Sequence, residues 1–193
     1  MNYLGHALLS GSDDILIGNF IADAVKGKAV NDYPSLVKAG ILLHREIDCY
    51  TDSHPAFLNM KRRLSTSYRH YSGVIADIYI DHFLANGWNA FSSMPLTVFT
   101  QRVYRLLEYN SESLPLKFQK LLPHMISNDW LYNYSKLYGV QKSLEGLSRR
   151  TSFDSGMENA IYALSQDYPF YKHQACLFLS DAIKRFPGTY TLK

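Results

Sequence analysis

Apolar residues recur three and four positions apart along most of the chain, which is the spacing of one face of an α-helix. This spacing, together with helix-breaking residues, predicts helices over residues 2–10, 15–25, 36–51, 54–68, 74–91, 93–109, 116–126, 131–147, 155–166 and 170–186. We expect Asp13 or Asp14 to cap the second helix and Ser35 to cap the third. No segment alternates apolar and polar residues between hairpin turns, so the pattern predicts an all-α, multi-helix bundle.

The composition is that of a globular chain. It has 193 residues, 47% of them hydrophobic, with 20 Lys+Arg against 17 Asp+Glu. This length favours a single domain over residues 1–193, and a net charge of +3 is too small to indicate nucleic-acid binding. The N-terminus lacks the pattern of a signal peptide, and no apolar run reaches the ~20 residues of a membrane span. We therefore expect a cytoplasmic protein that does not contact a membrane.

Ionisable and amide side chains interrupt the apolar faces of four predicted helices at helical spacing. They form these groups, with members four residues apart: Asn2 and His6; Asn19 and Asp23; His44, Asp48 and Asp52; Asp77 and Asp81, with His82 beside the last. A buried carboxylate is costly unless it is paired or binds a cation. If the four polar faces converge, the nearby cations are only Arg45 and Lys26. Such a set of imidazoles and carboxylates in an apolar bundle is typical of a divalent-metal site.

Several of these residues also have a structural interpretation. Asn2 is suited to cap the first helix, and Asp77 to complement the dipole near a helix start. Asp52 can end its helix ahead of Pro55, and a lone His6 is more typical of a buried histidine with ordinary hydrogen bonds. The metal interpretation therefore depends on the coincidence of all four groups.

The same residues stand in segments that resemble the acyl carrier protein phosphodiesterase family. These segments are Asn2–His6, Gly18–Asp23, Gly40–Asp48 and Thr51–Pro55, followed by Tyr71–Asp77, Asp81–Leu84 and Trp88. In this order they cover residues 2–91. The second half of the chain carries no comparably specific motif.

This resemblance implies an HD-domain-like fold, because the family is described as a divergent branch of the HD-type metal-dependent phosphohydrolases. It implies hydrolysis of holo-acyl carrier protein, which releases 4′-phosphopantetheine from a serine, with Mn²⁺ as cofactor and an acidic carrier protein as partner. One feature departs from ordinary HD enzymes, whose ligands include an adjacent His-Asp pair. Here His44 is followed by Arg45, and Asp81 precedes His82. A carboxylate ligand on the third helix would therefore be Asp48.

With this resemblance, the polar groups give a set of expected metal ligands: His6, Asp23, His44, Asp48, Asp77 and Asp81. The metal would lower the pKa of a water molecule for in-line attack on phosphorus. Arg45 or Lys26 would stabilise the phosphoryl charge, and His82 or His6 would protonate the leaving serine. The expected catalytic residues are Asp23, His44, Arg45, Asp48 and His82. The expected substrate-binding residues are Asn2, Asn19, Lys26 and Arg45.

A basic run on the fourth predicted helix is a candidate docking surface for the acidic carrier protein. It consists of Lys61-Arg62-Arg63 with Arg69, and further candidates near the motif helices are Lys26, Lys28 and Lys38. A solvated helix face is the alternative interpretation of such a run.

The residues alone leave other functions open. An HD-type phosphohydrolase acting on a nucleotide or another small phosphoester would use the same ligands. A non-catalytic helical protein would use them only to hold a metal or to support its core. Catalysis by Cys49 is disfavoured, because a thiolate beside the carboxylate of Asp48 would be a weak nucleophile. The sequence does not predict the oligomeric state.

Overall fold

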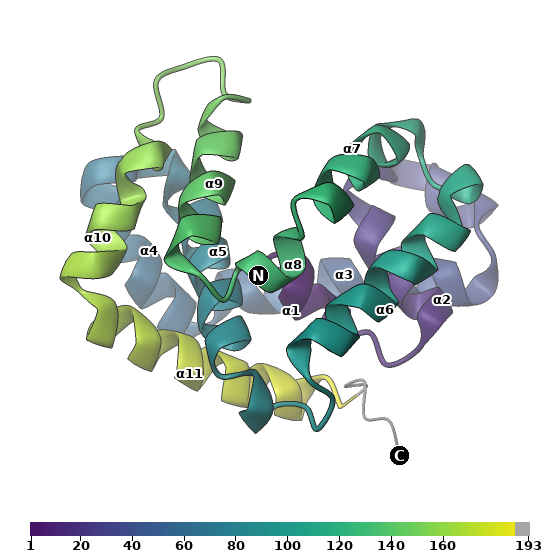
Figure 1. Cartoon of the computed structure of the whole chain (residues 1–193), viewed down its shortest axis with the longest axis horizontal. Coiled ribbons are helices and arrows are strands. Elements are labelled where there is room, and N and C mark those ends of the chain that lie inside the picture. The colour runs from purple at the N-terminus through teal and green to yellow at the C-terminus, as the bar shows by residue number, and fades with distance from the viewer. Residues whose placement is uncertain (188–193) are drawn as a thin grey trace.

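A computed structural model describes residues 1–187 and shows a helical protein (Figure 1). Its α-helices are α1 (Tyr3–Leu8), α2 (Asp13–Ile21), α3 (Ser35–Ser53), α4 (Pro55–Tyr68), α5 (Ser72–Asn86), α6 (Leu96–Tyr109), α7 (Leu116–Ser127), α8 (Trp130–Asn133), α9 (Leu137–Ser148), α10 (Ala160–Gln166) and α11 (Tyr168–Arg185). Short 3₁₀ helices join several of them, and the described residues contain no strand. The all-α class predicted from the sequence is therefore confirmed.

Helix α5 forms the centre of the fold because it is apolar on nearly all sides. Eleven of its residues are buried. A helix of this kind is stable only when other helices cover every face, and α5 packs against α1, α4, α9 and α11. In Figure 1, α4, α9, α10 and α11 gather around it on one side of the molecule, while α2, α3, α6 and α7 form the other side.

Several predicted helices are shorter in the structure; for example, α5 ends at Asn86 rather than at residue 91, and α10 begins at Ala160 rather than at residue 155. The second predicted helix ends at Ile21 and continues as the 3₁₀ helix Ala22–Ala24 (η1), whereas the sequence predicted helix as far as Val25. The segment predicted as one helix over 131–147 is divided into α8 and α9. Lys136 precedes α9 with extended backbone angles (φ −116°, ψ 138°), which break the helical path.

The predicted side-chain caps are wrong. The residues in the N-cap positions of α2 and α3 are Ser12 and Pro34, and neither side chain accepts a hydrogen bond there. Pro34 leads directly into α3, because its ring holds φ at −53°. Asp13 lies in the first turn of α2 instead, where Oδ1 pairs with Arg102 of α6 at 3.1 Å.

Helices α2 and α3 cross with their backbones in contact. A Cβ atom on Gly18 would lie 2.0 Å from the carbonyl oxygen of Val37, and one on Gly40 would lie 2.1 Å from that of Ile15. Such distances are shorter than real Cβ contacts, so both positions require glycine. The crossing places Asn19, the residue after Gly18, against the next buried turn of α3.

Helix α1 is held in place by a carboxylate of α5. Oδ1 of Asp81 accepts the backbone N–H groups of Asn2 and Gly5, each at 3.2 Å. Oδ2 of Asp81 accepts the N–H of Leu4 at 2.8 Å. These donors lack partners within the helix, so one buried carboxylate satisfies the N-terminus of α1. The position of His6, one turn further along, follows from this anchor.

We expect Gly18→Ala to lower the free energy of unfolding by about 3 kcal/mol, because the new methyl group overlaps backbone atoms of α3. Urea unfolding followed by circular dichroism measures the change. Gly73→Ala is the matched control, since the nearest atom to a Cβ there, on Lys61, lies 3.8 Å away. A Gly18→Ala protein as stable as the wild type would contradict the close crossing.

Candidate metal centre and cleft

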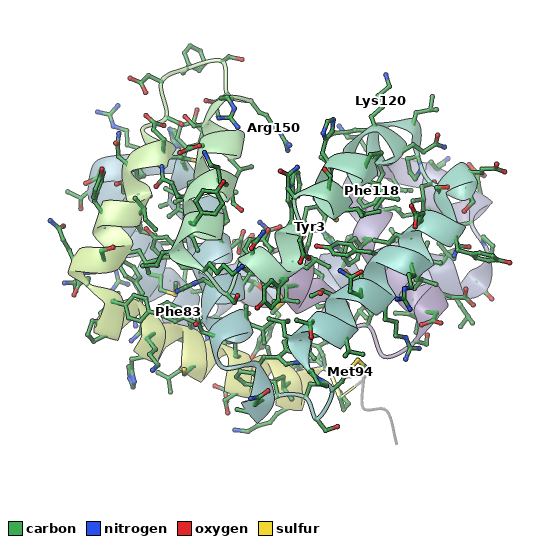
Figure 2. The ribbon with its side chains drawn as sticks, in the orientation of Figure 1. Tyr3, Phe83, Met94, Phe118, Lys120 and Arg150 are labelled. Atoms are coloured by element: carbon green, nitrogen blue, oxygen red, sulfur yellow. The ribbon has the colours of Figure 1, made fainter. Side chains whose placement is uncertain are left out.

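An open cleft of about 1060 Å³ lies between α7 and α9. In Figure 1 these two helices stand on either side of an opening, with α1 and α8 at its base. Aromatic side chains form much of the wall: Tyr3, Phe20, Phe118, Trp130, Tyr134 and Tyr138. Figure 2 shows Tyr3 and Phe118 together on the α7 side of the opening, and their ring centroids are 6.4 Å apart.

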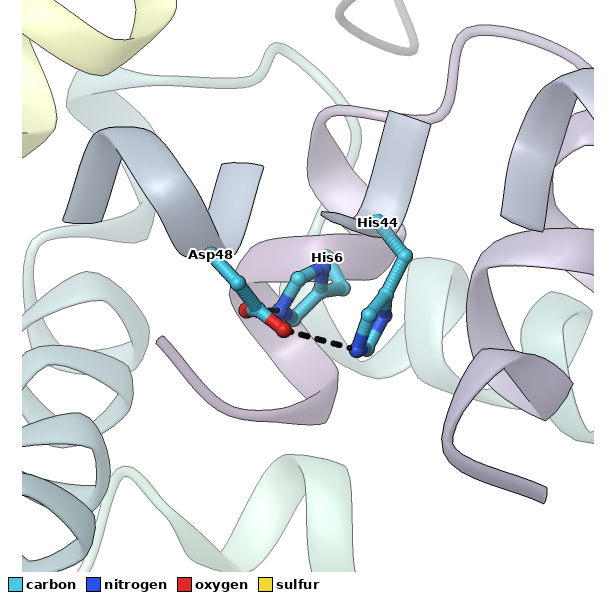
Figure 3. A group of neighbouring side chains, drawn as sticks. All are labelled: His6, His44 and Asp48. Atoms are coloured by element: carbon cyan, nitrogen blue, oxygen red, sulfur yellow. Dashed lines mark ion pairs between the residues drawn. The ribbon is translucent and has the colours of Figure 1, made fainter. Parts of the chain in front are cut away.

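Three polar side chains converge at the base of the cleft (Figure 3). Oδ1 of Asp48 lies 3.2 Å from Nε2 of His6, and Oδ2 of Asp48 lies 3.2 Å from Nε2 of His44. The two imidazole rings stack with their centroids 4.0 Å apart. One potential ligand atom from each residue lies within 4.8 Å of the other two. We call His6, His44 and Asp48 the His–Asp group; it joins α1 to two successive turns of α3.

Asp23 extends this group from η1. Its Oδ1 lies 3.5 Å from Nε2 of His44. The side chain of Asp23 is 79% exposed, compared with 47% for Asp48 and 11% for His44. Asp23 therefore lies at the open edge of the group, where the early end of α2 and the 3₁₀ turn place it.

Asn19 fixes the orientation of the His44 ring. The Nδ2 amide of Asn19 donates to the main-chain carbonyl of His6 and to Oγ of Ser10, each at 3.0 Å. A carbonyl oxygen can only accept, so Oδ1 of Asn19 must face Nδ1 of His44, which lies 3.0 Å away. Nδ1 therefore carries a proton and donates it. Nε2 is therefore the nitrogen that faces Asp23 and Asp48. In metal sites, a hydrogen bond from the other ring nitrogen commonly fixes the histidine in this way.

Without a metal ion, the pKa values of the two histidines of the His–Asp group shift in opposite directions. Burial lowers the pKa of His44, but hydrogen bonds to Asp23 and Asp48 outweigh it and raise the pKa to about 9. Burial lowers the pKa of His6 to about 4. Burial also opposes ionisation of Asp48, yet hydrogen bonds from both histidines hold its pKa well below the usual range. At neutral pH the group is thus an imidazolium, a neutral imidazole and a carboxylate.

This donor set fits a divalent metal ion. Imidazole and carboxylate together are ligands that Mn²⁺, Fe²⁺ and Zn²⁺ accept. Within residues 1–187, the ion-pair partners of Asp23 and Asp48 are only histidines. Nδ1 of His6 is buried and has no hydrogen-bond partner among these residues. A divalent cation would replace the proton of His44 and neutralise the carboxylates.

The structure does not bring Asp77 or Asp81 into the His–Asp group, although the spacing predicted both as ligands. Asp81 is fully buried and binds the N-terminus of α1 with both oxygens. Burial raises its pKa to about 7. Oδ1 of Asp77 lies 2.8 Å from the amino group of Met1, and burial raises the pKa of Asp77 as well. Both carboxylates therefore hold the N-terminal residues of the chain in place.

Asn2 and His82 also serve the packing of helices. Asn2 lines the cleft, but its side chain caps α1 by accepting the N–H of Tyr3 at 2.8 Å. Nδ1 of His82 donates to the carbonyl oxygen of Tyr134 at 2.7 Å, and Nε2 accepts from the hydroxyl of Tyr168 at 3.1 Å. His82 is buried and does not line the cleft. The geometry therefore gives no support to His82 as the proton donor.

The cations of the cleft are residues that the sequence did not indicate. Arg45 and Lys26, predicted to bind phosphate, are exposed and do not line the cleft. Arg45 instead donates from Nη2 to the carbonyl oxygen of Val25 at 3.1 Å. The positively charged residues that line the cleft are Lys117, Lys142, Arg149 and Arg150. They lie in the second half of the chain, where no spacing pattern marked them.

The fold and the cleft define an all-α protein with an open His–Asp centre, an arrangement typical of a hydrolase. The chain belongs to the acyl carrier protein phosphodiesterase family, whose sequence profile matches residues 1–182. The resemblance seen in residues 2–91 is therefore confirmed, and it extends through the second half.

Individual relatives give the same result. Proteins named acyl carrier protein phosphodiesterase from Yersinia pestis and Photorhabdus laumondii are each 32% identical to this chain over 170 residues. The protein of that name from Serratia proteamaculans is 33% identical over the same length. These matches cover 87% of this chain and 86% to 88% of the relatives.

Two further findings concern the fold and membrane insertion. No solved structure matches the chain significantly, so the HD-like fold stays a prediction. Within residues 1–187, no helix is both long and apolar enough to cross a membrane.

We expect the histidines of the metal-free protein to titrate on opposite sides of the ordinary value of 6.5, His44 at about 9 and His6 at about 4. The folded pKa of His44 is the higher one, so its ion pairs stabilise the metal-free fold at low pH and are lost as pH rises through about 9. Proton NMR titration in the presence of a chelator measures both values. In Asp48→Asn the pKa of His44 should fall, because one carboxylate partner is removed; an unchanged value would contradict the pairing.

Proposed function

We propose that this chain is a metal-dependent phosphodiesterase that hydrolyses holo-acyl carrier protein. It releases 4′-phosphopantetheine and leaves the apo-protein with a free serine. Membership of the family and the names of the relatives support the enzyme class and the substrate. The observation that carries the metal-dependent chemistry is the convergence of His6, His44 and Asp48, whose ligand atoms lie within 4.8 Å of one another at the base of an open cleft.

The openness of the group favours catalysis over a purely structural metal site. Structural metal sites are filled by protein ligands, whereas catalytic sites keep a position for water or substrate. Here Asp23 is exposed and Asp48 half-exposed, and both line the cleft together with the two histidines. A substrate phosphate can therefore reach the group from the cleft.

When bound at this group, a divalent cation (Mn²⁺, by the family resemblance) would lower the pKa of a water molecule and stabilise negative charge on the phosphate. The residues of the chain bind and orient. His6, His44 and Asp48 would hold the cation, and Asp23 lies at the open edge of this group. Asn19 is a positioning residue, because it holds His44 with Nε2 toward the carboxylates. In the reaction the bond between phosphorus and the serine oxygen is replaced by one to the oxygen of water, and the serine oxygen takes up a proton.

The aromatic wall beside the group is suited to the uncharged arm of the substrate. The rings of Tyr3, Phe20 and Phe118 pack together, with centroids 5.3 to 6.4 Å apart. Burial raises the pKa of Tyr3 to about 12, so its hydroxyl stays protonated and can donate a hydrogen bond to the phosphate. The wall keeps water away from the bound arm and leaves the phosphate at the His–Asp group.

Mass spectrometry of holo-acyl carrier protein tests the proposal directly. With Mn²⁺ we expect the phosphopantetheine mass to be lost, and with excess chelator we expect it to be retained. His44→Ala and Asp48→Ala should each lower turnover more than about 100-fold, because each removes a metal ligand. His173→Ala is the matched control, since this exposed histidine of α11 does not line the cleft.

Two results would overturn the proposal. Near-normal turnover in both ligand variants would remove the His–Asp group from the chemistry. Hydrolysis of a nucleotide or another small phosphoester, with holo-acyl carrier protein left intact, would assign the chain to the small-molecule phosphohydrolases instead.

A further inference from the structure

The charged residues that line the cleft are separated by sign. Among the described residues, the lining carboxylates all come from the first 77 positions: Asp23, Asp48, Asp52 and Asp77. The lining lysines and arginines all come from positions 117–150: Lys117, Lys142, Arg149 and Arg150. We call these four cations the basic wall. An acidic base is suited to a metal ion, whereas a basic wall attracts an anionic partner.

The positive charge of the basic wall is only partly neutralised. Glu145 pairs with Lys142 at 3.0 Å and lies 3.9 Å from Arg149. Lys117 and Arg150 form no ion pair within the part of the chain that the structure describes. One carboxylate thus serves two of the four cations, and the other two remain available to a partner.

The basic wall lines the same cleft as the His–Asp group. Figure 2 shows Arg150 at the end of α9, pointing into the opening toward α7, where Phe118 and Lys120 lie. Arg150 and Tyr3 both line this cleft. A partner held by Arg150 would therefore lie over the opening of the cleft.

The same wall carries an exposed aromatic side chain. Tyr138 lines the cleft and is 66% exposed, and Nζ of Lys142 lies 5.6 Å from the centre of its ring. Tyrosine and arginine are enriched in protein–protein interfaces relative to the rest of a surface. This composition suits a protein partner better than a free small anion.

In the basic run that the sequence indicated as a docking surface, Lys61 and Arg63 of α4 form ion pairs within the chain. Arg63 pairs with Asp167 and lies over the ring of Phe170 at 4.5 Å. Nζ of Lys61 lies 3.8 Å from Asp52. No residue of this run lines the cleft.

We propose that the basic wall docks an acidic face of the protein substrate and so delivers its phosphodiester to the His–Asp group. This inference rests on the proposed function, which takes the carrier protein as the partner. Docking on both sides of the opening places the modified serine above the cleft, where the arm can extend toward the base.

The double variant Lys117→Glu/Arg150→Glu tests the docking surface. Fluorescence anisotropy of a labelled apo-carrier protein reports docking without the arm, and we expect the variant to raise Kd about tenfold or more at low ionic strength. The difference should shrink in concentrated salt, which screens exposed charges. In kinetics with holo-carrier protein, KM should rise more than kcat falls.

Arg105→Glu/Lys172→Glu is the matched control, because it changes the net charge equally on helices α6 and α11, away from the cleft lining. An equal loss of affinity in this control would overturn the proposal, as would a loss caused by Arg62→Glu on α4 but not by the wall variant. Binding of a labelled single-stranded DNA as tightly as the carrier protein would indicate a general polyanion site instead.

The two proposals fail in different ways. Wild-type protein that binds the carrier protein through the wall but leaves its phosphopantetheine in place would retain the docking surface and remove the proposed reaction. Metal-dependent hydrolysis with a KM that the wall variant does not change would retain the reaction and remove the docking surface.

Discussion

The contact between the backbones of α2 and α3 at Gly18 and Gly40 is the constraint on which the site depends. It leaves no room for a side chain on either glycine, and it sets Asn19 within 3.0 Å of His44. Asn19 in turn bonds the main chain of α1. Three helices thus share one hydrogen-bond chain, and its last member is the ring that faces the carboxylates. A looser crossing would release the ring, because a single amide determines its orientation.

Carboxylates of this fold serve two purposes, and their burial separates them. Asp81 is fully buried and accepts three backbone N–H groups, so it fixes α1 and with it His6. Asp23 is exposed and Asp48 half-exposed, and both face histidines rather than backbone donors. Ions and substrates can reach only the second kind. The chemistry at the base of the cleft therefore depends on a structural carboxylate that does not take part in it.

The sequence predicted the helices and the pairing of His44 with Asp48, because both follow from helical periodicity within one element. It did not distinguish Asp81 from the ligands, since spacing alone does not show that the N-terminus of α1 would occupy its oxygens. The sequence did not show that His82 would lie outside the cleft, for a related reason: its partners, Tyr134 and Tyr168, lie far away in sequence. The basic wall arises only when the fold sets α7 opposite α9, so no local pattern could indicate it.

The position of the bound metal is the most direct test of the claim that the crossing of α2 and α3 assembles the metal site at the base of the cleft. Crystals grown with Mn²⁺ and measured at the manganese absorption edge would give its position from anomalous scattering. We predict one peak coordinated by His6, His44 and Asp48, with Asp23 at its open side. A peak held by Asp77 or Asp81, or one that touches neither histidine, would contradict the assignment.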